Sequence, residues 1–525
     1  MSDISIQGRR WLAPGIVLAL GLTTQAIWQF AVPWYWGWDS VGYLAIGRMY
    51  FHLPYHMWAI KNYYGPGYPI FLTLMGVHHL DTLRYLAAGT WLVGGTMPYF
   101  LYRAIEPFHR TSATIAAVAF AGCFGNAVLS TDMMNHHFHA FSLVVMASFF
   151  SRYYFHRSLA NAVWLSVVAA LSNTIRGSSV FIFIWAVGTL AVVVWVERRR
   201  LQSSAQVALI LAGLYVATTL LLSAGRVAVL GGPFQYGLTQ DIGTRVMFQG
   251  AYYGASIFEK QFYPEDDPVF VRPENGPASR KLFAAMKAYI EDPHINAAEL
   301  HLSEKNDKQE AYQSLILRPT HFNTYLFWWG YDGIVGSHEA QRQLRKVVIE
   351  TILSQPRILK YYAWNLWNFL FGPELLPETG CIDCKCPPCF TKDRIDPRGP
   401  SFMGKEVFAD VAGPGLIAEM RQEFNRSKKE QTYREAVYSV VRFAFGFKPL
   451  LTFLLFLSVL VARGPTRYVA IYFLGAVLVL AGTTSLAWPG QFRYVYPIFP
   501  FLFGGAAIAV TDISARIVEF RRSRS

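Results

Sequence analysis

The chain has 525 residues, of which 53% are hydrophobic and 15% are charged, and its formal net charge is +13. Soluble domains normally carry roughly 25% charged residues, so the composition argues against a soluble globular protein. A basic chain can bind nucleic acid, but here the basic residues stand at the ends of apolar runs. That pattern is typical of membrane proteins, and no nucleic-acid partner is expected.

Apolar runs close to the length of a membrane-spanning helix, about 20 residues, recur along the chain. They predict ten spans, at 11–32, 83–105, 113–130, 136–154, 160–175, 178–196, 205–224, 441–462, 467–487 and 494–514. In lipid only helices and closed barrels satisfy their own backbone groups, and the alternating segments of a barrel are absent from the sequence. The expected fold is therefore an all-α polytopic membrane protein with about ten transmembrane helices and a mixed exterior segment.

The first run follows Arg9 and Arg10 but precedes a poor signal-peptidase site at 33–36, so we expect a retained anchor. With both chain ends in the cytoplasm, every inner segment carries at least two basic residues, as the positive-inside rule requires. These residues are Arg9, Arg10, Arg103, Arg110, Arg152, Arg157, Arg198 to Arg200, Arg463, Arg467, Arg516, Arg521, Arg522 and Arg524.

This topology divides the chain into three parts. The expected domains are an N-terminal transmembrane module (1–224) with a first exterior loop (33–82), an exterior segment (225–435) and a C-terminal transmembrane module (436–525). Within the exterior segment, residues 341–371 predict a helix whose aromatic second half suits the membrane interface. The alternative is an eleventh span, which the later arginines argue against.

Three of the 34 acidic residues lie outside 225–435 at predicted helix starts on the exterior face: Asp39 in WDSVGYL, Asp81 in LDTLRYL and Asp132 in STDMMNHHF. An Asp at such a position commonly caps the helix. Asp81 fits a cap alone. For Asp39 and Asp132 the spacing leaves a cap and a catalytic role equally open.

The stretch DMMNHHFH places His136 one helical turn after Asp132, and His139 close to one turn after His136. One interpretation is a divalent-metal site at His136 and His139. The other, which is the more common situation, is polar side chains at the mouth of a cavity.

Four of the five cysteines crowd into CIDCKCPPC, as Cys381, Cys384, Cys386 and Cys389. Because this stretch is predicted to lie outside the membrane, two disulfides are favoured over a zinc site. A redox CPPC motif is the third alternative, but no thioredoxin-like βαβ pattern surrounds it.

Five motifs now stand in order along the chain: WDSVGYL, GPGYP, STDMMNHHF, SNTIRG and QFRYVYP. This order resembles the GT-C class of membrane glycosyltransferases that use polyprenyl-phosphate sugars. Relatives include the protein O-mannosyltransferases, the lipid A aminoarabinose transferase and the rhizobial galacturonosyltransferases. The resemblance covers about residues 10–200 and 465–510. Asp39-Ser40 replaces the Asp-Glu pair of the protein O-mannosyltransferases, and Gly65 stands where the motif has Pro.

The resemblance implies inverting transfer of a sugar from a polyprenyl phosphate to an acceptor hydroxyl. It implies that Asp39 is the base that takes the hydroxyl proton. The residues implied for the donor phosphate are Arg493, Arg176, Lys61 and Tyr494, since guanidinium groups grip phosphate oxygens. Those implied for the remaining substrate contacts are Tyr43, Tyr64, Tyr68 and Asp132.

The expected partners are a polyprenyl-phosphate-linked sugar, membrane lipid and a glycan, glycolipid or protein acceptor, and the segment 225–435 is expected to select the acceptor. The expected location is a bacterial inner membrane with the active site facing the periplasm. A lipid or solute transporter is the main alternative, but it would place ionisable groups near the middle of spans. A protein O-glycosyltransferase of the same fold and a non-catalytic envelope assembly protein are the others.

Overall fold

The computed structural model describes residues 2–34, 38–53, 65–77, 82–198, 201–230, 242–254, 271–292, 294, 308–317, 327, 330–372, 414–486 and 492–524. The chain forms two compact units. The first comprises Met1–Gln240, Pro373–Leu480 and Gln491–Ser525, and the second comprises Asp241–Gly372 and Ala481–Gly490.

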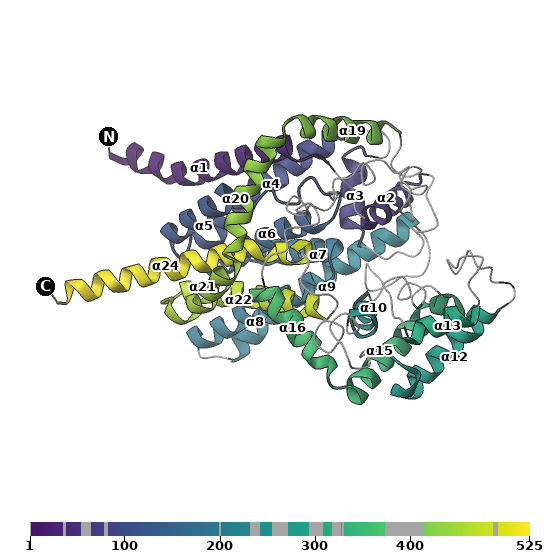
Figure 1. Ribbon diagram of the computed structural model, residues 1–525. Helices are drawn as coiled ribbons and strands as arrows, with labels where there is room; N and C mark the ends of the chain where they lie inside the picture. Colours follow the sequence, from purple (N-terminus) through teal and green to yellow (C-terminus); the bar gives the residue numbers. More distant parts are fainter. Residues whose placement is uncertain are drawn as a thin grey trace. The chain divides into compact units, whose positions relative to one another are not determined.

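In the described part of the first unit, the secondary-structure elements are helices (Figure 1). They are α1 (Ser2–Ala31), α2 (Trp38–Tyr50), α3 (Gly67–Leu74), α4 (Arg84–Ile105), α5 (Arg110–Gly122), α6 (His136–Phe155), α7 (Leu159–Ile175), α8 (Ser179–Arg198), α9 (Leu201–Leu230), α19 (Pro414–Lys429), α20 (Gln431–Gly446), α21 (Lys448–Val461), α22 (Thr466–Ser485), α23 (Phe492–Val495), the 3-10 turn η5 (Tyr496–Ile498) and α24 (Phe499–Arg522).

A helix lies at each of the ten predicted spans, but not all of these helices are suited to cross a bilayer. Among the described residues, five helical stretches are long and apolar enough: Leu12–Ala31, Ser179–Arg198, Leu201–Val229, Thr466–Ser485 and Tyr496–Arg522. Helices α20 and α21 add a sixth if their pair, bent by 42°, is one broken span. An all-α, multi-pass architecture is supported, and the number of about ten crossings stays a prediction.

The predicted span 113–130 is wrong in its second half, because α5 ends at Gly122. Residues 123–131 form buried turns instead. Irregular backbone is tolerated at membrane depth only where the protein covers it and satisfies its polar groups. Helix α1 does both, since Gln25 donates to Ser130 Oγ at 2.7 Å and Asn126 donates to the Gly21 carbonyl at 2.9 Å.

Glycines allow α1 and α4 to approach closely. A Cβ on Gly21 would lie 2.2 Å from the Gly95 carbonyl oxygen, so no larger residue fits this crossing. Without a hydrophobic drive between helices in lipid, close backbone packing of this kind is a main source of association. The Trp91 indole adds a hydrogen bond to the Leu22 carbonyl at 2.9 Å.

The arginine-bearing helix ends gather at one end of the first unit. Arg157, between α6 and α7, pairs with Glu197 at the end of α8 at 2.5 Å. Arg463, after α21, pairs with Glu519 of α24 at 2.9 Å. Both chain termini lie at this same end, whereas α2 and α3 lie at the opposite one (Figure 1). The two ion pairs join helix ends that the charge pattern assigns to one and the same side, and which side of a membrane this is stays a prediction.

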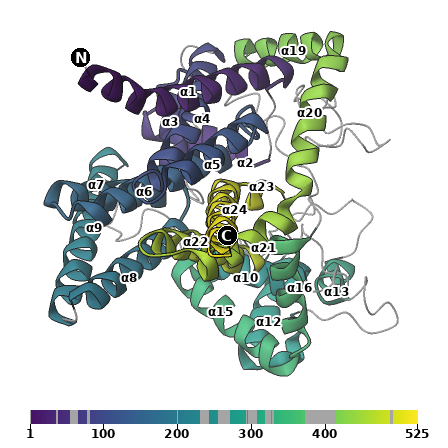
Figure 2. The same cartoon turned by 90° about the vertical axis from the view of Figure 1, so that its left-hand side faces the viewer.

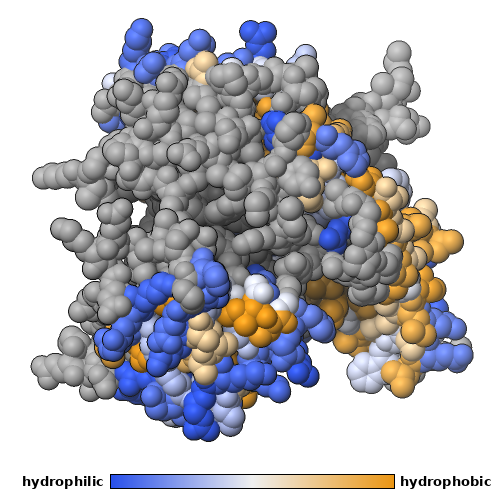
Figure 3. Space-filling view, turned by 90° about the vertical axis from the view of Figure 1, so that its right-hand side faces the viewer, coloured by the Kyte–Doolittle hydropathy of each residue, from blue (hydrophilic) through white to orange (hydrophobic). Residues whose placement is uncertain are grey.

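Apolar side chains cover an outer flank of the first unit. Leu209 and Leu221 of α9 are 72% and 73% exposed, and Ile184 of α8 is 59% exposed. Figure 3 shows this flank as a continuous hydrophobic band. Largely exposed leucines along a long helix are typical of a lipid-facing surface.

The described residues of the second unit are also helical, so the expectation of a mixed exterior segment is not met there. Its elements are α10 (Ile242–Gln249), the π-turn η2 (Gly250–Gly254), the 3-10 turn η3 (Pro273–Asn275), α12 (Pro277–Glu291), α13 (Lys308–Leu317), α15 (Ser337–Ser354) and α16 (Ile358–Phe371). The single helix predicted over 341–371 is in fact α15 and α16. Their separation at 355–357 follows from Pro356, which lacks the N–H that a continuous helix needs.

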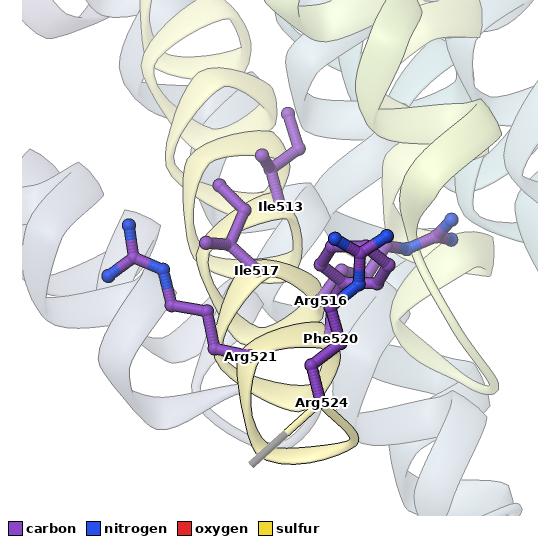
Figure 4. Close-up of a pocket in the computed structure, with 6 residues that line it drawn as sticks. All are labelled: Ile513, Arg516, Ile517, Phe520, Arg521 and Arg524. Carbon is purple, nitrogen blue, oxygen red and sulfur yellow. The ribbon is translucent and has the colours of Figure 1, made fainter.

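A shallow hollow lies on the last turns of α24, lined by Ile513, Arg516, Ile517, Phe520, Arg521 and Arg524 (Figure 4). Arg516 donates to the Val461 carbonyl at 2.6 Å, and the Arg524 guanidinium lies over the Phe520 ring at 4.1 Å. Seen along the bundle, this end of α24 faces the viewer beside α21 and α22 (Figure 2). The hollow therefore belongs to the arginine-rich end and is remote from the motif residues described next.

Candidate active site

Two motif segments meet because of a glycine. Gly67 begins α3, and a Cβ there would lie 2.3 Å from Thr174 Oγ1 and 3.0 Å from Ile175 Cγ1. Only glycine lets α3 come this close to the last turn of α7. The GPGYP motif is thereby packed against the two residues that precede Arg176.

Arg176 lies at the break between α7 and α8, with extended backbone (φ −153°, ψ 123°). Its N–H donates to the Ser172 carbonyl at 3.0 Å, and its carbonyl accepts from the Ser179 N–H at 3.1 Å. Asn135, just before α6, donates to the Ile175 carbonyl at 2.9 Å. These bonds fix the backbone from which the guanidinium extends.

The Arg176 side chain joins three motif segments into one cluster. Its Nη1 donates to His136 Nδ1 at 3.0 Å, and its guanidinium carbon lies 5.0 Å from the centroid of the Tyr494 ring. The His136 and Tyr494 rings meet edge to face, with centroids 5.2 Å apart. Because a guanidinium can only donate, His136 Nδ1 is the acceptor, which assigns the ring proton to Nε2.

A second set of polar side chains surrounds Asp132, whose own side chain is buried with 6% exposure. Burial, and then the charge of Asp132, raise the pKa of the Tyr68 phenol well above its ordinary value of 10.0. Tyr68 is thus protonated at neutral pH and keeps its O–H as a donor. The Tyr43 ring of α2 packs edge to face on Tyr68 with centroids 5.2 Å apart.

Helix α2 is tied to the Asp132 segment by a hydrogen bond from Ser40 Oγ to the Met133 carbonyl at 2.8 Å. Ser40 follows Asp39, and Met133 follows Asp132. The segments that carry the two aspartates therefore meet at this point. Asp39 lies in the first turn of α2, but its side chain is outside the described residues.

The neighbouring histidines have different partners. His139 Nε2 lies 3.0 Å from Ser179 Oγ, whereas His137 Nδ1 lies 3.3 Å from the Tyr496 hydroxyl, which donates to the Gly125 carbonyl at 2.9 Å. Within the described residues, no three His, Cys, Asp or Glu side chains gather as a metal site would require. The metal hypothesis for His136 and His139 stays a prediction, and the Arg176 cation at His136 disfavours a second cation there.

Several predicted residues fall outside what the structure describes. Lys61, Tyr64, Asp81 and the cysteines at 381–389 lie in undescribed segments, and the side chain of Arg493 is not described. Arg493 directly precedes Tyr494 in α23, so its backbone lies beside the cluster. Of the predicted site residues, the structure brings together His136, Arg176 and Tyr494 in one group and Asp132, Tyr68 and Tyr43 in the other.

Sequence reasoning missed the two residues that align these segments, Asn135 and Ser40. Neither carries catalytic chemistry of its own, and each acts on a backbone carbonyl far away in sequence. The one signal in the sequence is position, since each residue adjoins a motif residue, Asn135 next to His136 and Ser40 next to Asp39.

Among the described side chains, the arrangement offers the Arg176 cation and the Asp132 carboxylate at the end of the unit opposite the arginine-rich end. The guanidinium fork of Arg176 matches two oxygens of a phosphate. Asp132 supplies a buried acceptor, and Tyr68 supplies a neutral donor. The first group suits a phosphate, and the second offers hydrogen bonds that suit a polyhydroxylated group.

No protein-family model matches the sequence, and no curated protein matches it. Among solved structures, the chain is similar to the archaeal oligosaccharyltransferase AglB from Archaeoglobus fulgidus, in complex with an inhibitory peptide and a dolichol-phosphate. The identity is 13% and the TM-score 0.42, over 97% of this chain and 51% of that chain. It is also similar to the arabinosyltransferase EmbB from Mycobacterium smegmatis, with 14% identity and a TM-score of 0.32, over 88% and 41% of the two chains. The chain thus spans about half the length, or less, of the structures it matches.

Proposed function

We propose that the protein is an integral membrane glycosyltransferase that moves a sugar from a polyprenyl-phosphate donor to an acceptor hydroxyl. The observation that carries the proposal is the Arg176–His136–Tyr494 cluster. It joins three motif segments that are far apart in sequence around a half-buried cation, and its member His136 lies four residues after the buried Asp132. Arg176 is half-buried between two apolar helices, where a charge is costly, and a lipid phosphate is a natural counter-charge.

In the proposed reaction, the acceptor oxygen attacks the anomeric carbon of the donor sugar while the bond from that carbon to the phosphate oxygen breaks. Polyprenyl phosphate leaves with the bonding electrons, and Asp39 takes the acceptor proton. Arg176, together with Arg493 and Lys61, stabilises the charge that grows on the leaving phosphate. Tyr494 and Tyr64 orient the phosphate, and Tyr43, Tyr68 and Asp132 contact the sugar. Attack opposite the leaving group inverts the anomeric configuration.

The location of the site supports transfer on the exterior face. The cluster lies at the end of the first unit opposite the arginine-bearing loops, and such loops face the cytoplasm in membrane proteins. We therefore place the reaction on the periplasmic side of a bacterial inner membrane. A cell-envelope glycan or glycolipid is the proposed acceptor, selected by the segment 225–435, and a protein hydroxyl is the alternative.

The proposal is tested with the full chain in lipid nanodiscs, using a long-chain polyprenyl phosphate as the probe. Wild-type protein should bind it, and Arg176→Gln should weaken binding roughly tenfold or more, as expected for a lost charged hydrogen bond. Asp39→Asn should bind the probe normally but lose transfer of sugar from lipid-linked donors. Wild-type affinity in a folded Arg176→Gln protein would refute the assignment, as would absence of binding in the wild type.

A further inference from the structure

Behind Arg176, four polar side chains form a buried chain of contacts across three helices. Ser142 and Ser172 Oγ atoms lie 2.8 Å apart, Ser172 Oγ donates to Ser179 Oγ at 2.8 Å, and Ser179 Oγ lies 3.0 Å from His139 Nε2. None of the four is more than 9% exposed. We call these residues, from α6, α7 and the start of α8, the serine–histidine network.

The serine–histidine network brackets Arg176. Ser172 precedes it by four residues and Ser179 follows it by three, so their hydroxyls bond across the break between α7 and α8. Ser179 Oγ also lies 3.2 Å from the Ser172 carbonyl, the same carbonyl that accepts from the Arg176 N–H. At the break, where helical backbone bonding is interrupted, the network thus adds a second donor to the carbonyl that already holds the Arg176 N–H.

Helix α6 holds Arg176 at two points. His136 accepts from the guanidinium, and His139, close to one turn later on the same helix, contacts the serine that ends the break. Alanine would fill the space of these serines at no desolvation cost, whereas a buried hydroxyl must be hydrogen-bonded to be tolerated. We therefore explain this buried polar network by its alignment of the Arg176 segment rather than by packing.

We propose that the serine–histidine network is a positioning device that holds the Arg176 guanidinium ready for the donor phosphate. This inference rests on the proposed function, since it takes a lipid phosphate to be the ligand of Arg176. By fixing the backbone on both sides of Arg176, the network reduces the freedom that the side chain would lose on binding. None of the four residues touches the reacting atoms in this scheme.

The test measures binding of a long-chain polyprenyl phosphate to the full chain in nanodiscs. Ser172→Ala and Ser179→Ala should each weaken binding roughly tenfold, the effect of about one hydrogen-bond energy. Ser179→Thr keeps the hydroxyl and should restore most of the affinity. The matched control is Ser166→Ala, because Ser166 is equally buried on α7 but donates to the Leu211 carbonyl of α9 at 3.2 Å. It should bind within about twofold of wild type.

A double-mutant cycle separates positioning from general stability. In an Arg176→Gln background, Ser172→Ala should cause no further loss, because the group it positions is already gone. Equal losses in both backgrounds would overturn the inference, and so would unchanged binding by Ser172→Ala alone. If Ser172→Ala does not fold, Ser142→Ala at the edge of the network takes its place in the cycle.

The two proposals fail in different ways. A wild-type protein that does not bind polyprenyl phosphate refutes the proposed function. In that case, thermal unfolding midpoints are measured for the four proteins of the cycle: wild type, Ser172→Ala, Arg176→Gln and the double variant. Non-additive changes in the midpoint support the inference that the network aligns Arg176, and additive changes refute it.

Discussion

Replacing Gly67 with alanine tests whether the close approach of α3 to α7 holds the candidate site together. The new Cβ would lie 2.3 Å from Thr174 Oγ1, 3.0 Å from Ile175 Cγ1 and 3.2 Å from the Thr174 carbonyl carbon, whereas ordinary contacts begin near 3.4 Å. The Thr174 hydroxyl must therefore retreat by about 1 Å. That movement breaks its 2.6 Å bond to the Leu171 carbonyl.

The lost bond is worth about 1 kcal/mol, and overpacking of a tight core usually destabilises by about 1–3 kcal/mol in total. We expect a lower thermal unfolding midpoint in detergent. We also expect polyprenyl-phosphate binding weakened at least tenfold, because a displacement near 1 Å at a binding group can cost up to about a hundredfold. Both are measured on purified full-length protein, the second in nanodiscs.

The matched control is Gly177→Ala, next to Arg176, where a new Cβ would have no atom within 4 Å. This variant should resemble wild type in both measurements. Adding Thr174→Ala to Gly67→Ala removes the nearest clashing atom and should recover part of the stability. A Gly67→Ala protein as stable and as competent as Gly177→Ala would show that the packing argument is wrong.

Three further predictions concern single side chains. Arg176→Lys should not retain wild-type affinity in a titration with polyprenyl phosphate, because an ammonium group lacks the two-pronged fork of the guanidinium. Although burial raises it, the pKa of Glu350 is lowered overall by bonds from the N–H groups of Ala278 and Ser279. The contribution of Glu350 to folding stability should therefore be complete above pH 4.5 and lost as the pH falls through the lowered pKa of this carboxyl group. Glu350→Gln should flatten this pH dependence of the thermal unfolding midpoint. Glu419 of α19 accepts from the Leu83 N–H at 2.6 Å. Glu419→Ala should therefore lower the free energy of unfolding by about 1 kcal/mol, measured as a lower thermal unfolding midpoint, and Glu419→Gln should keep part of this stability.

The helices could be predicted from the sequence wherever apolarity alone determines them. A helix lies at each predicted span, although the span 113–130 is helical only in its first half, because about 20 apolar residues in lipid have few alternatives to a helix. The end of α5 at Gly122 could not be predicted in this way. It depends on hydrogen bonds that Gln25 and Asn126 make between α1 and the turns at 123–131, and these bonds arise only after the helices have packed.

The candidate site could be predicted in composition but not in pairing. Arg176 and His136 were both recognised, one as a phosphate ligand and the other as a metal ligand or cavity residue. Their contact joins residues 40 positions apart across a helix pair, so no local pattern encodes it. The residue type indicates the chemistry available to Arg176 and His136, whereas the packing of α6 against α7 determines that the two side chains meet.

The contacts between α6 and the segment before α24 have a consequence for biosynthesis. His137 and Tyr496 touch although 359 positions separate them. At ribosomal rates of about 5–20 residues per second, the histidine emerges roughly 20–70 s before the tyrosine is made. During that interval the N-terminal half lies in the membrane with its cationic cluster incomplete. Under the proposed function, a nascent chain that has not yet reached Tyr494 would lack one of the three members of the Arg176–His136–Tyr494 cluster and so would not yet bind the donor.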